Sequence, residues 1–395
     1  MNSSRAPETN GKTKDLPGLS RLKVFALAAL VAVGLLIIGG LTVSASTFSA
    51  TSSLQEGPTP TPTFITPLIV PGGQSGVLIT DLALPDSAFV LHWFAPNSDP
   101  SRAVAWGDVD NDGDLDLAVA NWGKPNRVYI NNNGVLDTDP RHVWQSSDPA
   151  EKDDFTTSLA WGDVNGDGYL DLVVGNEPSC PEASRFISPE IAKFFPRTRA
   201  AQAGLCSGGA NRLYLYDKTL GTLSTSANWS STEREKTRSI ALGDIDGDGS
   251  LDLAVGNYGA PNRVYVNSGG ALGAQFRDAW QSNDPSEETD LTTGLALGDV
   301  NSDGWPDLVV GNEAGPARLY LNTNGRLNSS ADWSSPGKLD VNALALADTD
   351  EDGALDLVMV TAEQRIELYL NEGGTFGDQS MVGPRVTGYP ISLAL

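Results

Sequence analysis

The sequence predicts an all-β protein built from a unit of about 50 residues that recurs along the chain. An acidic loop of nine residues occurs five times, and each copy lies between two short apolar runs of the kind that forms buried strands. After each second run come a turn, a run that contains a tyrosine and, in four of the five units, a tryptophan. Four strands per unit, repeated around an axis, are typical of a β-propeller.

The acidic loops share one pattern of side chains. Oxygen-bearing side chains stand at loop positions 1, 3, 5 and 9, glycine stands at position 6, and the residue at position 7 varies. Ca²⁺ takes about six to eight oxygen ligands, and alternating carboxylates can converge on it if a glycine permits the turn and position 7 offers its carbonyl oxygen. The loops are DVDNDGDLD (Asp108 to Asp116), DVNGDGYLD (Asp163 to Asp171), DIDGDGSLD (Asp244 to Asp252), DVNSDGWPD (Asp299 to Asp307) and DTDEDGALD (Asp348 to Asp356).

This pattern predicts about five Ca²⁺ sites, one in each loop. The predicted ligands are Asp108, Asp110, Asp112, Asp114 and Asp116; Asp163, Asn165, Asp167, Tyr169 and Asp171; Asp244, Asp246, Asp248, Ser250 and Asp252; Asp299, Asn301, Asp303, Trp305 and Asp307; and Asp348, Asp350, Asp352, Ala354 and Asp356. An EF-hand would need a bidentate glutamate at position 12, where this chain has valine or methionine in every copy. Each loop is therefore expected to join two strands.

The residues before the repeats predict a membrane anchor and a spacer. Residues 1–23 are polar with basic side chains, and residues 24–43 are uncharged and long enough to cross a bilayer as one helix. The positive-inside rule then keeps residues 1–23 in the cytosol and exports the rest. A cleaved signal peptide, which would give a secreted protein, is the alternative. Residues 44–76 are rich in Ser, Thr and Pro and predict a disordered stalk, so the repeat domain is expected at 77–395.

One insertion interrupts the second unit at residues 178–207 and carries the two cysteines of the chain, Cys180 and Cys206. In an exported protein an isolated pair usually forms a disulfide. The termini complement each other, because Ile391 to Leu395 matches the first strand of a unit while the residues around Trp93 match the end of one. The sequence thus predicts about six blades, five with calcium loops and one composite blade shared between the termini; the alternative is that the chain is a truncated piece of a longer one.

The loops, the NRVYIN-type runs that follow them (Asn126 to Asn131 in the first unit) and the spaced tryptophans resemble FG-GAP/VCBS repeats, the calcium-bearing blades also found in the integrin α-subunit head. The resemblance covers about residues 77–395. It implies a calcium-binding propeller, and a role in cell adhesion or ligand binding. Because these repeats also occur in lectin-like modules and some polysaccharide lyases, the resemblance does not fix one function.

Charge and sequence motifs argue against some classes of function. The net charge of -24 argues against a nucleic-acid partner, which needs clustered Lys and Arg. No GxSxG, HExxH or paired Cys/His arrangement is present, so no catalytic residue is assigned and a non-enzyme is expected. The favoured function is a cell-surface module that binds an extracellular protein or carbohydrate. A calcium-dependent polysaccharide lyase and a passive structural ectodomain are the alternatives.

Overall fold

The computed structural model describes residues 65–70, 76–81, 90–147, 154–179, 207–268, 276–283, 291–363, 365–378 and 380–383. Regular secondary structure in these residues is entirely β-strand, and they contain no helix long and apolar enough to cross a membrane. The predicted cytosolic tail, membrane helix (24–43), cysteine pair and C-terminal strand (391–395) lie outside the described residues.

A three-stranded N-terminal sheet opens the described structure. It pairs β1 (Ile65–Val70), β2 (Gly76–Asp81) and β3 (Val90–Phe94) in chain order, all antiparallel. β1 lies inside the stretch expected to be a disordered stalk (44–76), and the sheet therefore begins before residue 77. The Pro-rich composition hid a run, ITPLIV, whose β-branched residues suit a strand; a single proline is tolerated where its missing N–H is not needed.

Five further antiparallel sheets follow, called blades 1 to 5 here, and each contains one acidic loop. Blade 1 contains β4 (Ser101–Gly107), β5 (Asp116–Asn121), β6 (Arg127–Tyr129) and β7 (Trp144–Gln145). Blade 2 contains β8 (Asp154–Gly162), β9 (Asp171–Ser179), β10 (Ser207–Gly208), β11 (Arg212–Tyr214) and β14 (Trp229–Ser230), with a small hairpin of β12 (Tyr216–Asp217) and β13 (Thr222–Leu223). Blade 3 contains β15 (Thr237–Gly243), β16 (Asp252–Asn257), β17 (Arg263–Asn267) and β18 (Phe276–Gln281). Blade 4 contains β19 (Leu291–Gly298), β20 (Asp307–Glu313), β21 (Arg318–Tyr320) and β22 (Trp333–Ser334), and blade 5 contains β23 (Val341–Ala347), β24 (Asp356–Thr361), β25 (Ile366–Tyr369) and β26 (Met381–Val382).

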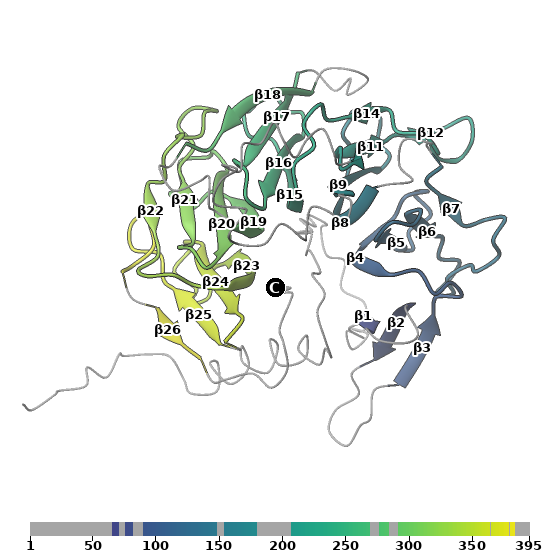
Figure 1. Cartoon of the computed structure of the whole chain (residues 1–395), viewed down its shortest axis with the longest axis horizontal. Coiled ribbons are helices and arrows are strands. Elements are labelled where there is room, and N and C mark those ends of the chain that lie inside the picture. The colour runs from purple at the N-terminus through teal and green to yellow at the C-terminus, as the bar shows by residue number, and fades with distance from the viewer. Residues whose placement is uncertain are drawn as a thin grey trace, which may run out of the picture.

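The blades follow one another around a common centre, which is the arrangement of a β-propeller (Figure 1). The first strand of each blade lies nearest the centre and the tryptophan strand lies at the rim. Second strands such as β5 are buried at every residue because a blade covers each of their faces. This explains why they read as continuous apolar runs rather than as alternating ones.

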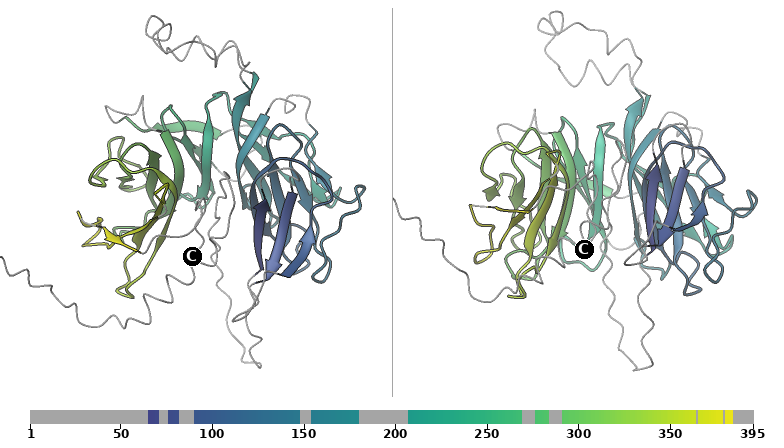
Figure 2. Two further views of the ribbon diagram at one scale, coloured as in Figure 1. Left: turned by 60° about the horizontal axis from the view of Figure 1, so that its bottom comes forward. Right: turned by 90° about the horizontal axis from the view of Figure 1, so that it is seen from below.

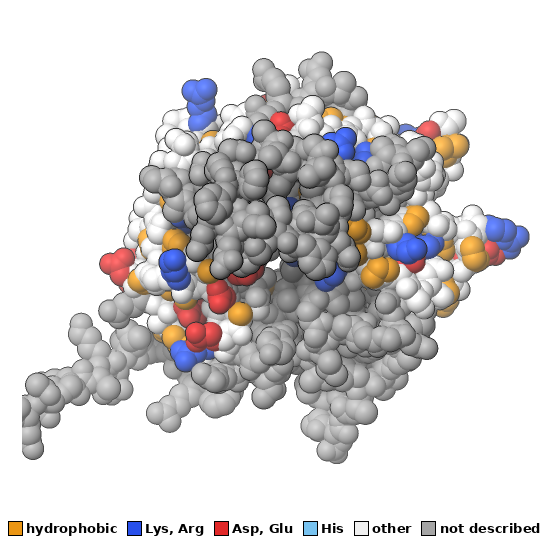
Figure 3. Space-filling model, viewed as in Figure 1, with side chains coloured by type: hydrophobic (Ala, Val, Ile, Leu, Met, Phe, Trp, Pro, Cys, Tyr) orange, Lys and Arg blue, Asp and Glu red, His pale blue; other side chains and the backbone are white. Residues whose placement is uncertain are grey.

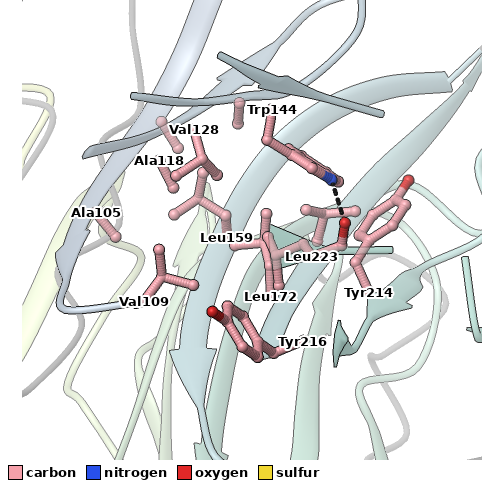
Figure 4. Packing of buried hydrophobic residues seen from close by; sticks show 13 residues of the cluster. Ala105, Val109, Ala118, Val128, Trp144, Leu159, Leu172, Tyr214, Tyr216 and Leu223 are labelled. Carbon is pink, nitrogen blue, oxygen red and sulfur yellow. Dashed lines mark hydrogen bonds between the residues drawn. The ribbon is translucent and has the colours of Figure 1, made fainter. Parts of the chain in front are cut away.

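Neighbouring blades are joined by a repeated pair of aromatic rings. The tryptophan at the rim of one blade packs edge to face on the tyrosine in the third strand of the next. The pairs are Trp93–Tyr129, Trp144–Tyr214, Trp229–Tyr265, Trp280–Tyr320 and Trp333–Tyr369, with ring centroids 5.1 to 5.5 Å apart. In the joint between blades 1 and 2, the Trp144 indole N–H also donates to the Leu223 carbonyl at 3.0 Å (Figure 4). The five joints connect the N-terminal sheet and the five blades in series.

A second joint lies at the glycine that precedes each of loops 1 to 4. A Cβ on Gly107 would come within 2.7 Å of Trp161, and one on Gly162 within 2.8 Å of Leu242 and Leu251, both from the following blade. Blade 5 has Ala347 at this position and Met381 at the rim position of the tryptophan, and Met381 is 41% exposed. Ala347 and Met381 both lie on the side of blade 5 against which no further blade packs among the described residues.

The insertion is anchored by strand pairing. β9 runs on to Ser179 and pairs with β10, with Pro178 opposite Gly208 and Ser179 opposite Ser207. The expected boundaries, 178–207, therefore include the stem of the insertion, because the blade extends its second strand instead of ending in a short turn. Residues 180–206, with Cys180 and Cys206, lie outside the described residues.

Candidate metal sites

All five acidic loops join the first strand of a blade to its second, as the sequence predicts. Because they occupy the same connection in each blade, they lie at the same end of the strands and share one face of the molecule. The 20 acidic residues of the loops therefore lie on that face. Figure 2 shows the propeller from the side, with the strands running between its two faces. The opposite face is formed by the turns after the second strands and by the connections between blades.

The loop backbone turns at two positions, only one of which the sequence revealed. The glycine at position 6 has a positive φ in every loop, from 89° to 97°, a conformation that side chains with a Cβ rarely adopt. Position 4 also has a positive φ in every loop, between 58° and 75°, although Asn111, Ser302 and Glu351 occupy it in three of them. No side-chain type is common to position 4, so its shared conformation left no signal in the sequence.

The position 1 aspartate closes each loop on itself. In loop 1, Asp108 accepts hydrogen bonds from the Asp112 and Gly113 backbone N–H groups, both at 3.0 Å. The same two-oxygen clamp recurs in loops 2, 4 and 5, and in loop 3 the Gly247 N–H at position 4 replaces the position 5 donor. Each position 5 aspartate accepts a hydrogen bond from the N–H of position 7. These bonds turn the position 1, 3 and 5 side chains toward one region while leaving lone pairs for a cation.

The position 9 aspartate is a buried structural link. In loop 3 one oxygen of Asp252 accepts from the N–H groups of Ile245 and Asp246, and the other accepts from Asn267 at the end of the third strand. The equivalent aspartates bond in the same way, and all five are at most 1% exposed. Burial raises the pKa of Asp116, Asp171, Asp252 and Asp307 to about 6, against the opposing effect of the backbone donors. A bound cation would favour the ionised form of these groups.

The carboxylates of loops 1, 3 and 5 fit a divalent cation. Asp108, Asp110 and Asp116 each place an oxygen within 4.8 Å of the others, and so do Asp244, Asp246 and Asp248, and Asp348, Asp350 and Asp356. Two oxygens that each lie about 2.3 to 2.6 Å from the same Ca²⁺ cannot be separated by much more than 4.8 Å, so these spacings fit one ion. One oxygen of Asp110 is buried and makes no hydrogen bond in the protein. Burial and the charge of Asp112 raise the pKa of Asp110, which is the effect that a bound cation would oppose.

Loops 2 and 4 differ from the others at position 3. Asn165 and Asn301 stand there, and each accepts the N–H of position 5 through its side-chain oxygen. In loop 2, Lys218 donates to the Asp167 carbonyl at 2.7 Å and lies 3.7 Å from its carboxylate. These loops therefore hold less negative charge around the same backbone frame. The ligating role of all 25 predicted residues, including the position 7 carbonyls, stays a prediction.

We expect replacing Asn165 with aspartate to raise the calcium affinity of loop 2 by about tenfold, because calcium affinity rises with the number of charged ligands. Asn301→Asp in loop 4 is the matched variant, since it adds the same carboxylate without a neighbouring lysine. Calorimetric titration with calcium measures both. Unchanged affinity in both variants would show that position 3 does not face the cation.

An asparagine relay connects neighbouring loops, and sequence reasoning assigned it no role. An asparagine at or just after the end of the third strand donates its side-chain N–H to a carbonyl in the loop of the preceding blade: Asn267 to Val164, Asn322 to Ile245 and Asn371 to Val300, at 2.7 to 2.9 Å. The backbone N–H of the same asparagine donates to the position 9 aspartate of its own blade. In the sequence, this relay could have been suspected from the asparagine that recurs after the tyrosine-containing run.

On the opposite face, a repeated asparagine after the second strand has a structural role. Asn121 donates to the Pro125 carbonyl at 2.7 Å and accepts from the Ser101 hydroxyl, and Asn176, Asn257 and Asn312 bond in the same way. A repeated arginine in the third strand pairs within its own blade. Arg127, Arg212 and Arg263 bind Asp99, Asp154 and Glu235, which lie where the chain enters the same blade. This geometry arises because the entering chain crosses the end of the third strand.

Blades of four antiparallel strands with an acidic loop between the first two define a class of repeat propeller. The sequence matches the family model described as FG-GAP-like repeat over residues 108–174, 203–255, 244–310 and 299–359, which together make up more than half of the chain. The chain belongs to the FG-GAP-like repeat family.

Known proteins with similar sequences carry the same kind of repeat. Cartilage acidic protein 1 from Xenopus tropicalis is 26% identical over 305 residues, which are 63% of this chain and 45% of that protein. Human cartilage acidic protein 1 is 35% identical over 92 residues, 23% of this chain and 14% of that protein. Human integrin alpha-IIb is 31% identical over 172 residues, 40% of this chain and 14% of that protein. The chain thus spans less than half the length of these relatives.

Proposed function

We propose that this protein is an extracellular, calcium-stabilised propeller that acts as an adhesion or ligand-binding module at the cell surface. The observation that carries the proposal is the chemical difference between its two faces. One face holds five near-identical loops whose side chains are already engaged in closing the loop and in the expected cation sites. The other holds side chains that differ from blade to blade, which a specific ligand requires. The similarity to cartilage acidic protein 1 and integrin alpha-IIb supports an extracellular setting.

The cations would be about five Ca²⁺, one in each loop. They would be held by the side chains at positions 1, 3, 5 and 9 and the carbonyl at position 7. A bound Ca²⁺ supplies charge neutralisation and fixes the loop. This chain's own residues supply the frame, through the position 1 clamp and the position 9 link. Millimolar calcium outside the cell would suit sites of modest affinity.

The proposed ring has six blades, with the N-terminal sheet as part of the sixth. Its β1 lies beside β4, as the second strand of each blade lies beside the first strand of the next. Trp93 makes the same joint with Tyr129 that the other rim tryptophans make. Residues 391–395 would supply the missing innermost strand. The alanine at 347 and the methionine at 381 fit this arrangement, because a composite blade without a calcium loop would not need the usual glycine and tryptophan.

Anchoring by residues 24–43, with the propeller outside and residues 1–23 inside, completes the proposal; secretion after signal cleavage is the alternative. The lyase alternative would need a catalytic base on the ligand-binding face, and a passive ectodomain would need none of the blade-to-blade differences seen there. We propose no enzymatic activity.

Two measurements on the full chain test this function. In cells that express it, protease added outside should remove the propeller while sparing residues 1–23; a protected propeller would contradict an external location. The purified protein in millimolar calcium should retain specific ligands on an array of extracellular glycans and surface proteins. Binding to nothing on the array would favour the passive ectodomain, whereas release of unsaturated sugar products would reveal a lyase.

A further inference from the structure

The first strands carry one irregular residue each, near the face opposite the acidic loops. The pairing with the second strand skips one residue in every blade: Arg102, Thr157, Arg238, Thr293 and Asn342. Such bulges redirect a side chain out of the regular pleat. Because the first strands are nearest the centre, the five residues surround the central axis at this end of the propeller (Figure 1).

Two of these residues have a structural role. The Thr157 hydroxyl donates to the Thr237 carbonyl at 2.6 Å, and the Thr293 hydroxyl donates to the Val341 carbonyl at 2.5 Å. Each threonine thus ties its blade to the first strand of the next. Arginine occupies the same position in blades 1 and 3, and its long side chain contacts an aromatic ring instead.

Both arginines are held over an aromatic ring. The guanidinium carbon of Arg102 is 4.5 Å from the centroid of Trp122, and that of Arg238 is 5.0 Å from the centroid of Tyr258. Trp122 in turn stacks on Phe155 at 4.6 Å, and the Tyr258 hydroxyl donates to Glu313 at 3.1 Å. Rings that are themselves fixed restrict the guanidinium groups, so less entropy is lost when a ligand binds them.

Glutamates alternate with the arginines around the ring. Trp122 and Tyr258 follow the second strands of blades 1 and 3, where blades 2 and 4 have Glu177 and Glu313. The Arg238 Nε lies 2.6 Å from Glu177, whose side chain is 8% exposed. Phe155, on which Trp122 stacks, is the cross-strand partner of Glu177, so one series of contacts connects Arg102 to Arg238.

We propose that Arg102 and Arg238, with Glu177 and Glu313, bind the carboxylate and hydroxyl groups of a sugar acid such as a uronic-acid unit. This inference rests on the proposed function and names its ligand class. A guanidinium group presents a planar fork that matches a carboxylate, and a glutamate accepts hydrogen bonds from sugar hydroxyls. A ligand with one carboxylate and several hydroxyls satisfies both kinds of residue.

Strongly anionic polymers fit this cluster less well. Glu177 and Glu313 would repel a dense row of sulfates or phosphates, and the whole chain carries a net charge of -24. Among the side chains coloured in Figure 3, Lys and Arg are scattered and interspersed with Asp and Glu, and they form no broad basic field. Two oriented guanidinium groups with glutamates beside them instead suit a ligand that carries few charges.

The test uses the purified full chain in millimolar calcium and a short galacturonate oligomer as the probe. Tryptophan fluorescence and calorimetry should both report binding, because Trp122 lies beside Arg102. Arg102→Gln and Arg238→Gln should each weaken binding by about tenfold or more, the loss typical of a charged hydrogen bond. Arg326→Gln, which changes an exposed arginine in a hairpin of blade 4, is the matched control and should bind as the wild type does.

Several outcomes would overturn the inference. They are equal binding by the Arg102→Gln variant and the wild type, equal binding of a neutral galactose oligomer, or tighter binding of an oligoglutamate peptide, which would indicate a protein partner. Arg238→Gln leaves Glu177 without its ion pair, so the melting temperature of this variant is measured too. If that temperature falls, the inference is judged on the binding of Arg102→Gln and Arg102→Lys alone. A wild type that binds other array ligands but not galacturonate refutes this inference alone, and one that binds nothing refutes the proposed function.

Discussion

Chelation of calcium lowers the melting temperature of the propeller by a large margin, and restoring millimolar calcium reverses the change. Without cations, the carboxylates of each loop repel one another in a small volume; the pKa of Asp110 is raised first by burial and then by the charge of Asp112. Each cation stabilises the folded state by RT ln(1 + [L]/Kd), about 2.7 kcal/mol at a 100-fold excess over Kd. Five such sites would together contribute on the order of the whole stability of a typical domain.

Calorimetry of the same sample in EDTA and in calcium measures this effect. Magnesium at the same concentration is the control, since its smaller size and preference for octahedral geometry suit these loops less. A melting temperature that is equal in EDTA and calcium would contradict a stabilising role for the loops.

Replacing Asp252 with alanine destabilises the calcium-saturated protein far more than the same change at Asp248 does. Both variants remove one expected ligand from loop 3. Asp252→Ala also leaves three N–H groups without an acceptor, those of Ile245 and Asn267, which are buried, and that of Asp246, which is partly buried, whereas Asp248 accepts only from Ser250 in an exposed part of the loop. An unsatisfied buried donor costs about 1 to 3 kcal/mol, so the difference should be at least about 3 kcal/mol.

Chemical denaturation of the two variants in saturating calcium measures that difference. Asp252→Asn, which keeps one carbonyl oxygen as an acceptor, should lie between the alanine variant and the wild type. Equal destabilisation by Asp252→Ala and Asp248→Ala would mean that the position 9 aspartate acts only as a ligand, and the structural link described above would be wrong.

The repeated loops made most of the fold predictable. A pattern that specifies Asp at positions 1, 5 and 9 and Gly at position 6 fixes the turn, and the apolar runs on either side fix the strands it joins. Interactions between blades were harder to predict. The rim tryptophans and third-strand tyrosines both recur in the sequence, yet nothing in their spacing shows that Trp144 meets Tyr214, 70 residues away, rather than a tyrosine of its own blade.

Backbone conformation and composition account for the remaining differences. The positive φ at position 4 is invisible because asparagine, glycine, serine and glutamate all occupy it. β1 was missed because proline and threonine dominate its surroundings, while strand formation depends on its pairing with β2. The arginine cluster was missed because its members are separated by up to 136 residues, from Arg102 to Arg238, and only the bulge in each first strand brings them to the same end of the propeller.

The most direct test of the central claim is the number of calcium ions bound by one chain. Equilibrium dialysis of the full chain against millimolar calcium, followed by elemental analysis, should give about five ions per molecule. A double variant of loop 3, Asp244→Ala with Asp248→Ala, should lose one of them and keep the rest. A wild type that binds no calcium, or a stoichiometry that the loop 3 variant leaves unchanged, would contradict the account.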